Sequence, residues 1–341
     1  MKPLATLVLA TLVGAAASAA APAAAQAAAQ AELPLIEAVL KGDRAAVQRL
    51  LRQHADVNAA NDYGATALYA ASTTCSVDLI GLLLDARANP NAPLRSGETP
   101  LMAAVDNGFI DAARLLLARG ADVNARESKG GQTALMWAAA GRQPEVVRLL
   151  VDRGADVRAR STGGFTALLF AAQQDDVESG RLLLQAGAGT NDTSAGDRMT
   201  ALMVAAASGH VGFSELMLEK GADPNLADER GFTALHYAAS DEKGAGLVRA
   251  LFSHGAVPNP RTTKDSREYV TAGVNLTGAT PLLLASARGN IETVRALVAG
   301  GADPFMKTDH GTAPLQVASW GGSPYFRDWT DDEKTHLLEV T

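Results

Sequence analysis

The chain has 341 residues, of which 47% are hydrophobic and only 5% aromatic, and its 37 acidic and 30 basic residues give a net charge of −7. This length allows several compact domains or one long array of small units. Few aromatic residues suit alanine- and leucine-rich helices better than a sheet-built core. The acidic balance gives no support for a nucleic-acid partner, which would need basic patches. The single cysteine, Cys75, excludes an intramolecular disulfide.

The first 25 residues have the pattern of a secretory signal peptide. A basic residue precedes an almost wholly apolar stretch, residues 4–13, and small residues then offer cleavage sites after Ala19 and Ala25. The alternative is a membrane anchor, but the apolar stretch is short for a span. We therefore expect export to a bacterial cell envelope, in the periplasm, no membrane span in the mature chain, and a short linker at residues 26–32.

A phrase of threonine, a small residue and leucine recurs along the rest of the chain. Its fullest copy is residues 231–239, Gly-Phe-Thr-Ala-Leu-His-Tyr-Ala-Ala. The threonines stand at positions 66, 99, 133, 166, 200, 233 and 280, in steps of 33 or 34 except for a last step of 47. A fixed period of this length indicates a stacked repeat protein.

Each part of the phrase has a mechanical role. The glycine before the threonine can take positive φ in a tight turn, and the threonine can cap a helix by accepting from a backbone N–H. Proline or alanine follows at the first helical position. A second phrase, as in residues 120–124 (Gly-Ala-Asp-Val-Asn), follows a run of leucines and so ends a helix. Each unit is therefore predicted to be turn, helix, short turn, helix and loop.

The two phrases together resemble the ankyrin repeat, and the resemblance extends over about residues 33–341. It implies an all-α ankyrin-repeat solenoid with about nine helix-turn-helix repeats and β-hairpin-like finger loops. The repeats are expected to start near residues 33, 66, 99, 133, 166, 200, 233, 280 and 313. The resemblance further implies a non-enzymatic scaffold that binds another protein through its fingers and concave face. We expect it to be monomeric and to need no cofactor.

Nine residues after the repeat's threonine position, most repeats carry glycine, which suggests a positive-φ residue between the two helices. Cys75 occupies this position in the second repeat. We therefore expect Cys75 to lie in a tight, partly exposed turn. A catalytic thiol is the less favoured alternative, because no neighbouring pattern supplies a histidine base.

The step of 47 residues means that about 14 residues are inserted in the seventh repeat. One falls near residues 242–244 and the rest between Pro258 and Gly278, so we expect a long polar finger loop at about 259–277. Long loops in compact arrays are functional or disordered. The alternative function is therefore a module associated with an envelope enzyme, with this insert contributing to the site.

No catalytic motif accompanies the repeats: there is no G-x-S-x-G, H-E-x-x-H, C-x-x-C or phosphate loop. We predict no catalytic, cofactor-binding or metal-binding residues. His210 and His236 stand where ankyrin repeats usually carry a hydrogen-bonding structural histidine. The aspartates of the Gly-Ala-Asp phrases are interpreted as acceptors that fix the loops rather than as calcium ligands.

In the family that the chain resembles, partners usually contact the hairpin tips and the ends of the first helices. The positions that match are Asp62, Tyr63, Arg95, Ser96, Glu98, Asp106, Asn107, Gln132, Phe165, Gln173, Gln174, Asp197, Met199, Glu229, Arg230 and Phe232.

Large apolar side chains at finger positions are candidate binding hot spots. They are Tyr63, Phe165, Met199 and Phe232. The alternative for each is that it packs on its neighbouring finger. Three other aromatic residues, each four residues after a repeat threonine, are expected to belong to the core: Trp137, Phe170 and Tyr237.

Overall fold

The computed structural model describes residues 34–264 and 275–319. The expected signal peptide and linker, residues 265–274 of the insert and the end of the array at 320–341 lie outside the described residues. Within the described ranges the chain is helical, with only two isolated β-bridges in its loops. The predicted all-α solenoid is therefore confirmed. None of the described helices is both long and apolar enough to cross a membrane.

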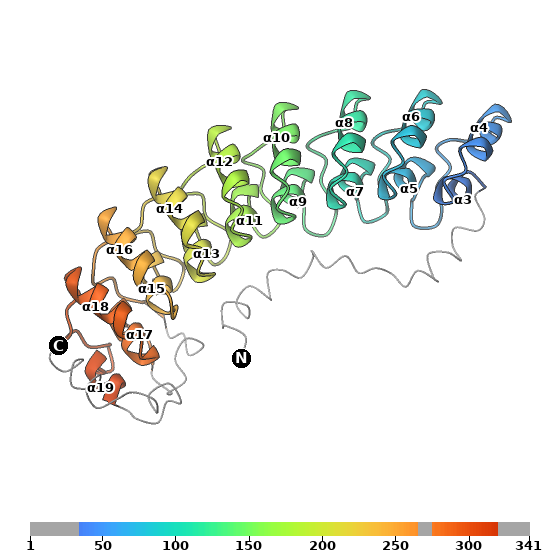
Figure 1. Cartoon of the computed structure of the whole chain (residues 1–341). Helices are drawn as coiled ribbons and strands as arrows, with labels where there is room; N and C mark the ends of the chain where they lie inside the picture. Colours follow the sequence, from blue (N-terminus) through green and yellow to red (C-terminus); the bar gives the residue numbers. More distant parts are fainter. Residues whose placement is uncertain (1–33, 265–274, 320–341) are drawn as a thin grey trace. The chain divides into compact units, whose positions relative to one another are not determined.

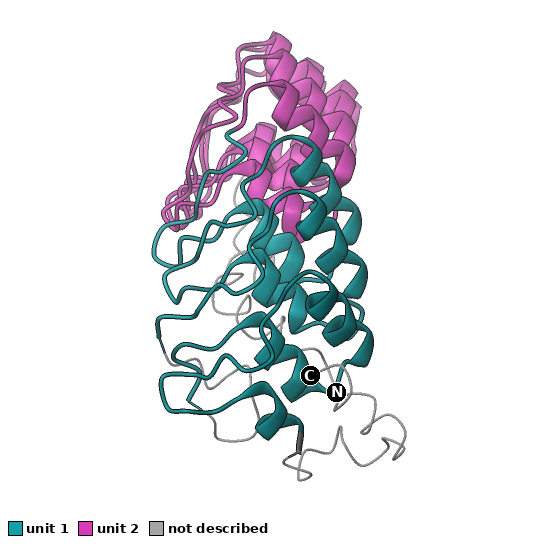
Figure 2. Ribbon diagram, turned by 90° about the vertical axis from the view of Figure 1, so that its left-hand side faces the viewer, with its two compact units in different colours: residues 1–12, 189–341 teal, residues 13–188 magenta. Residues whose placement is uncertain are grey.

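The chain divides into two compact units, with the boundary between Ala188 and Gly189 (Figure 2). We call the described residues before this boundary the N-terminal unit and those after it the C-terminal unit. Each described repeat contributes a pair of antiparallel helices, except the last, of which the structure describes only the first helix, α19.

The N-terminal unit contains five helix pairs. Their bounds are α3 (Pro34–Leu40), α4 (Arg44–Arg52), α5 (Ala67–Thr73), α6 (Val77–Asp85), α7 (Pro100–Asp106), α8 (Ile110–Ala118), α9 (Ala134–Ala140), α10 (Pro144–Asp152), α11 (Ala167–Gln173) and α12 (Val177–Gln185). The first helix of each pair packs against the first helix of the next pair, and the second helices form a parallel layer (Figure 1).

The C-terminal unit repeats this arrangement. Its helices are α13 (Ala201–Ala207), α14 (Val211–Glu219), α15 (Ala234–Ala239), α16 (Ala245–Ser253), α17 (Pro281–Arg288), α18 (Ile291–Ala299) and α19 (Pro314–Ser319). In both units the first helix of every described repeat begins one residue after the start that the sequence spacing predicts.

Threonine side chains cap the first helices of seven repeats, α5, α7, α9, α11, α13, α15 and α17, as the sequence predicts. In the described repeats the hydroxyl accepts from the backbone N–H three residues on at Thr66, Thr99, Thr133, Thr166, Thr200 and Thr280. Such a bond satisfies one of the N–H groups that a helix start leaves without a partner. At Thr233 the arrangement is reciprocal, because the His236 ring also accepts from the Thr233 backbone N–H at 3.1 Å.

The core lies between the two helix layers and between successive pairs. Alanines let the first helices approach closely, and in the N-terminal unit those that are wholly buried are Ala71, Ala104, Ala138, Ala139, Ala171 and Ala172. Leucines of the second helices fill the space behind them, and Leu83, Leu116, Leu150 and Leu183 are likewise wholly buried. A single pair could not cover this apolar surface, so each repeat depends on its neighbours.

Asparagines tie the loops behind the second helices into a ladder. Asn124 accepts from the Asp156 backbone N–H at 2.8 Å and donates to the Gly154 carbonyl at 3.2 Å. Asn91 and Asn225 make the same pair of contacts with the next repeat of their own unit. Asp156 in turn accepts from the backbone two residues on. The prediction that these aspartates fix the loops is confirmed.

The finger loops, which precede the first helices, form a second ladder. In each case a backbone N–H of one finger donates to a carbonyl of the previous finger. The pairs are Arg95 to Tyr63, Ser128 to Ser96 and Thr162 to Gly130 in the N-terminal unit, and Glu229 to Asp197, Thr263 to Arg230 and Asp309 to Thr277 in the C-terminal unit.

The residues on either side of the insert keep the backbone hydrogen bonds of the finger ladder, so the insertion point is at the tip of the finger. Thr263 bonds the finger before it and Thr277 bonds the finger after it. At the base, the Thr262 N–H donates to the Ala279 carbonyl at 3.0 Å. The inserted residues are therefore 264–276, a narrower range than the predicted 259–277.

Cys75 is exposed and has a φ of 53°, in the turn between α5 and α6. Gly108 and Gly209 take the same conformation at the matching positions, with φ of 71° in both. The predicted positive-φ turn at Cys75 is confirmed.

Replacing Thr99 with alanine should lower the free energy of unfolding by about 1 kcal/mol, because the Met102 N–H loses its cap. Hydrogen exchange of the Met102 amide should quicken in the same variant. Thr99→Ser keeps the hydroxyl and should retain most of the protection. Equal exchange in the alanine variant and the wild type would show that the cap contributes nothing.

Deleting residues 265–274 should leave the fold intact and change the free energy of unfolding by less than about 1 kcal/mol, because loop-closure entropy varies slowly with length. Thr262→Val is the matched comparison, since it removes the hydroxyl that accepts from the Ala279 N–H at 2.9 Å and should destabilise more. Urea denaturation of both variants measures this. A deletion variant that fails to fold would contradict the placement of the insert at the finger tip.

Candidate partner-binding surface

The finger loops and the first helices form one continuous side of each unit, which we call the finger face. Of the predicted contact residues, those exposed on it are Asp62, Tyr63, Arg95, Asp106, Asn107 and Glu229. Those half-buried are Ser96, Glu98, Gln132, Gln173, Gln174, Asp197 and Arg230. The remaining three, Phe165, Met199 and Phe232, are buried.

The prediction that Phe165, Met199 and Phe232 are binding hot spots is wrong in this structure, because their side chains retain only 7%, 4% and 0% of their exposure. The Phe165 ring packs 5.5 Å from Phe170. The Phe232 ring packs 5.6 Å from Tyr237. These three side chains instead pack within the repeat array, which was the alternative interpretation. Tyr63 is the one large apolar residue of the predicted set that stays exposed, at 52%.

Of the three aromatic residues expected in the core, one is buried and two are half-buried. Tyr237 is buried, and its hydroxyl donates to Asp228 at 2.8 Å. Trp137 and Phe170 are only half-buried, so the core assignment is incomplete for them. Both rings stand on first helices of the N-terminal unit, on α9 and α11. Each therefore adds apolar area to the finger face.

Tyr69, on α5, was missed by sequence reasoning. It lies three residues after its repeat threonine, a position that is apolar and buried in neighbouring repeats, as at Met102 and Met136. Its hydroxyl donates to Glu98 of the next finger at 3.1 Å. A polar aromatic residue in a column of methionine and leucine was the signal that could have revealed it.

The Tyr69 hydroxyl bonds one carboxylate, that of Glu98. Burial raises the pKa of Tyr69, and the negative charges of Glu98 and Asp106 raise it further. Asp106 lies at the end of α7, and loss of surrounding water raises the pKa of its carboxyl. Neither Glu98 nor Asp106 has an ion-pair partner among the described residues.

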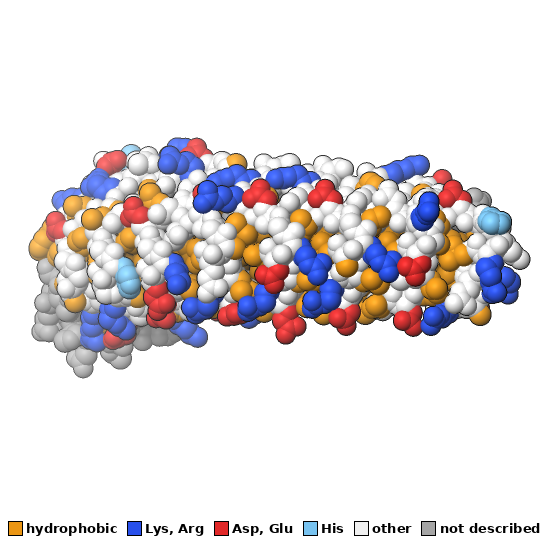
Figure 3. Space-filling view, turned by 90° about the horizontal axis from the view of Figure 1, so that it is seen from above, with side chains coloured by type: hydrophobic (Ala, Val, Ile, Leu, Met, Phe, Trp, Pro, Cys, Tyr) orange, Lys and Arg blue, Asp and Glu red, His pale blue; other side chains and the backbone are white. Residues whose placement is uncertain are grey.

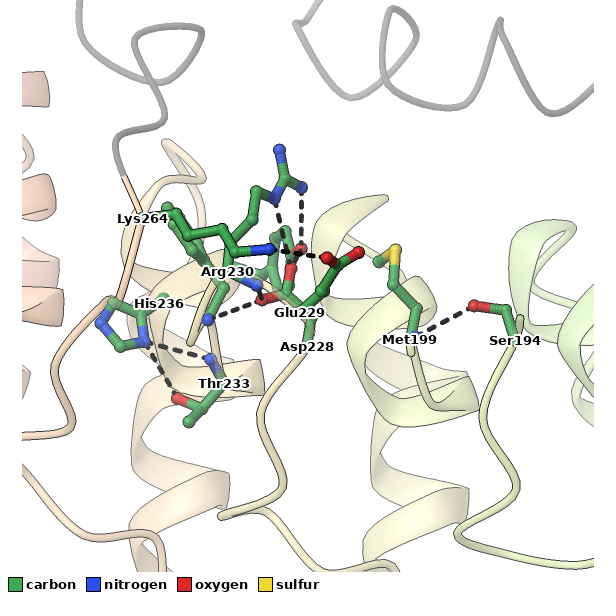
Figure 4. Close-up of polar contacts among 10 residues, drawn as sticks. Ser194, Met199, Asp228, Glu229, Arg230, Thr233, His236 and Lys264 are labelled. Carbon is green, nitrogen blue, oxygen red and sulfur yellow. Dashed lines mark hydrogen bonds and ion pairs between the residues drawn. The ribbon is translucent and has the colours of Figure 1, made fainter. Parts of the chain in front are cut away.

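The fingers of the C-terminal unit hold a polar cluster that is satisfied internally (Figure 4). The buried Asp228 carboxylate accepts from the backbone N–H groups of Arg230 and Phe232, both at 2.8 Å. The Arg230 guanidinium lies 3.5 Å from the same carboxylate and 5.6 Å from the centre of the Phe232 ring. These contacts lock the finger, because every charge in them already has an opposite or aromatic neighbour.

An ion pair joins two finger tips above this cluster. The Lys264 ammonium lies 2.6 Å from the Glu229 carboxylate and lowers the pKa of that carboxyl (Figure 4). Both side chains are about half exposed, at 55% and 51%. Because water screens both side chains, the pair contributes little to stability.

His236 connects two repeats across the insert. Its Nδ1 accepts from Thr233, and its Nε2 therefore carries the hydrogen that it shares with the Ala279 carbonyl at 3.2 Å. The ring is wholly buried, and burial lowers its pKa to about 4. The prediction of a structural, hydrogen-bonding histidine is confirmed. Within the described ranges no three His, Cys, Asp or Glu side chains are placed to hold a metal ion.

Comparison with known proteins gives a consistent result along the chain. The family described as ankyrin repeats (3 copies) matches residues 35–127, 126–194 and 168–262, and the single ankyrin repeat matches residues 277–309.

Curated relatives match over shorter stretches. The chain is 47% identical over 60 residues to the ankyrin repeat and KH domain-containing protein mask of Drosophila melanogaster, covering 18% of this chain and 2% of that protein. It is 44% identical over 71 residues to the 2-5A-dependent ribonuclease of Mus musculus, covering 20% and 10%. It is 31% identical over 141 residues to the mitochondrial disaggregase of Bos taurus, covering 41% and 19%. The chain thus spans a small part of the length of these relatives.

The buried His236 predicts a pH dependence of stability. Its pKa is about 4 when folded and 6.5 when unfolded, so between these values the unfolded chain binds the proton more tightly. The contribution of the neutral, buried His236 ring to the free energy of unfolding is complete above pH 6.5 and is lost as the pH falls towards 4. At pH 5 the loss should be about 2 kcal/mol, at 1.36 kcal/mol per pKa unit.

Urea denaturation at pH 7.5 and pH 5 measures this loss. His236→Gln should remove that part of the pH dependence, whereas His254→Gln, at an exposed histidine, should keep it. If the His236→Gln variant lost as much stability between pH 7.5 and pH 5 as the wild type, His236 would not be the source of the pH dependence.

Proposed function

The chain belongs to the ankyrin-repeat family, and we propose that it is an exported scaffold whose N-terminal unit binds a partner protein through its finger face. Ankyrin repeats are protein–protein interaction modules, typically without enzymatic activity. The proposal adds the face that is used. The observation that carries it is the combination of exposed Tyr63, half-buried Trp137 and unpaired Glu98 and Asp106 on that face.

The character of this face supports contact with a protein. Aromatic side chains supply large contact area at a low entropic cost, and they dominate binding hot spots. Tyr63 stands at a finger tip, while Trp137 and Phe170 stand on the helices behind the fingers. Polar residues such as Gln173 and Gln174 lie beside them. Protein interfaces combine aromatic contacts with polar residues, and the finger face offers both.

The second-helix side has a different character. Its surface carries acidic and basic side chains side by side (Figure 3). Several of them pair between repeats, as Arg119 does with Asp85 at 2.8 Å and Arg44 with Asp78 at 3.3 Å. Charges that neutralise one another give a partner little to recognise. The difference between the two sides favours the finger face as the place of binding.

Export is part of the proposal and has its own support, the apolar stretch and small-residue cleavage sites of the first 25 residues. Mass spectrometry of the secreted or periplasmic chain would test it. A mature chain that begins at residue 20 or 26 is expected. A chain that keeps its first residues would overturn export by this route.

The function is tested by affinity capture with the mature chain, residues 26–341, from the source organism's cell envelope, followed by titration of the captured protein. Tyr63→Ala with Trp137→Ala should weaken binding by 10-fold or more, as expected for hot-spot residues that each contribute more than 1 kcal/mol. Tyr63→Ala is also tested alone, because its side chain is exposed and its removal should weaken binding without affecting the fold.

Phe305→Ala is the matched control, because Phe305 is a still more exposed aromatic residue, at 72%, on a loop of the C-terminal unit. It should change the affinity by less than twofold. If the control weakens binding and the finger variants do not, the partner binds elsewhere.

A further inference from the structure

We infer that α12, the second helix of the fifth repeat, is less stable than α6, α8 and α10 and opens locally while those helices stay folded. The inference concerns stability within the N-terminal unit, so it does not rest on the proposed function. Three features carry it: the residues that α12 buries, two polar atoms at its start, and the way its loop is tied to the preceding repeat.

The second helices of the N-terminal unit each bury two neighbouring residues near their start. In the four preceding repeats the pairs are Ala46 and Val47 on α4, Leu79 and Ile80 on α6, Ala112 and Ala113 on α8, and Val146 and Val147 on α10. The matching pair on α12 is Ser179 and Gly180, and both are buried. This pair adds no apolar side chain to the core, and a glycine inside a helix is less favourable than an alanine.

Two buried polar atoms at the start of α12 have no hydrogen-bond partner. Asp176 caps the helix, because one oxygen of its carboxylate accepts from the Ser179 N–H at 3.1 Å. The other carboxylate oxygen, Oδ2, and the Ser179 hydroxyl are buried without a partner. Asp176 retains 7% of its exposure and Ser179 none. Opening of the helix would return both atoms to water, which offsets part of the packing lost.

The loop after α12 is tied to the preceding repeat by fewer side-chain bonds than the loops before it. Asn58, Asn91 and Asn124 each accept from a backbone N–H of the next loop and donate to one of its carbonyls. Arg158 stands at the matching position before the loop of α12 and donates to the Gly187 carbonyl at 3.0 Å. A guanidinium cannot accept a hydrogen bond, so one half of this contact is lost.

An ion pair between α10 and α12 does not replace that contact. The Arg148 guanidinium lies 3.3 Å from the Glu178 carboxylate, and the two side chains are 59% and 51% exposed. Water screens a pair this exposed, so it contributes little to holding α12 in place.

The opening can stay local because the contacts that fix the fifth finger and α11 lie outside α12. The Thr162 N–H donates to the Gly130 carbonyl of the previous finger, and Thr166 caps α11. Neither bond is lost when α12 separates from α10 and α11, its neighbours in the unit. Proteins open in such cooperative parts, each with its own free energy of opening.

Amide hydrogen exchange of the full chain, measured at several low urea concentrations, tests this inference. Amides of α12 should exchange about fivefold or more faster than those of α8 and α10, after correction for intrinsic rates. Their exchange should also depend less on urea, since a local opening exposes less surface than global unfolding.

Two reciprocal variants test the cause. Ser179→Ala with Gly180→Ala gives α12 the pair of α8 and should slow its exchange about fivefold, while α8 stays within twofold of the wild type. Ala112→Ser with Ala113→Gly places the α12 pair in α8 and should quicken exchange there by a similar factor. Ser179→Ala alone, which only removes an oxygen, should slow exchange in α12 by a smaller factor and decides the matter if the double variant does not fold.

Equal exchange in α8, α10 and α12 of the wild type would overturn the inference. Fast exchange in α12 that neither of its variants slows would also overturn it, because the opening would then have another cause. These outcomes leave the proposed function untouched, since Tyr63→Ala tests partner binding separately.

Discussion

The structure depends on the hydrogen bonds that tie neighbouring repeats together within each unit. One set joins neighbouring fingers through the backbone, and the other joins the loops behind the second helices through asparagines such as Asn124. An isolated pair of short helices would be marginal in water, because its apolar side would stay uncovered. The two ladders hold successive pairs in register, and the alanine-rich first helices then pack closely enough to exclude water.

This arrangement explains which changes the array accepts. An insertion is tolerated at a finger tip because the ladder bonds come from the arms, at Thr263 and Thr277. A cysteine is tolerated at position 75 because the turn requires a positive φ but no particular side chain. The side chains of the finger face project from a backbone that the ladders already fix, so they are free to determine recognition.

Most of the fold could be predicted from the sequence because its determinants are local. Threonine caps, glycine turns and loop aspartates each act within a few residues, so their spacing gives the helix starts directly. The candidate surface was harder to predict. Phe165 and Phe232 are buried because each packs against an aromatic ring, Phe170 or Tyr237, of the same repeat. The spacing shows that such rings are near one another but not which ring stays outside. Tyr69 was missed because its column is apolar in the neighbouring repeats.

In both units a finger acid is held by its own finger: Asp228 accepts from the N–H groups of Arg230 and Phe232, and Glu127 from those of Lys129, Gly130 and Gln132. In the C-terminal unit, Asp228 and Arg230 neutralise each other within the finger and stabilise its shape. In the N-terminal unit, Glu98 and Asp106 have no such partner among the described residues. Desolvating an unpaired carboxylate has a free-energy cost, and Asp106 shows it in its raised pKa.

Amide hydrogen exchange of the mature chain, with and without its captured partner, tests the central claim most directly. The account predicts slower exchange in residues 61–74 and 94–107, which hold the exposed tyrosine and the two carboxylates. Exchange in the second helices α8 and α10 should not change. Protection confined to the second helices, or to the C-terminal unit, would contradict the assignment of the finger face of the N-terminal unit as the binding surface.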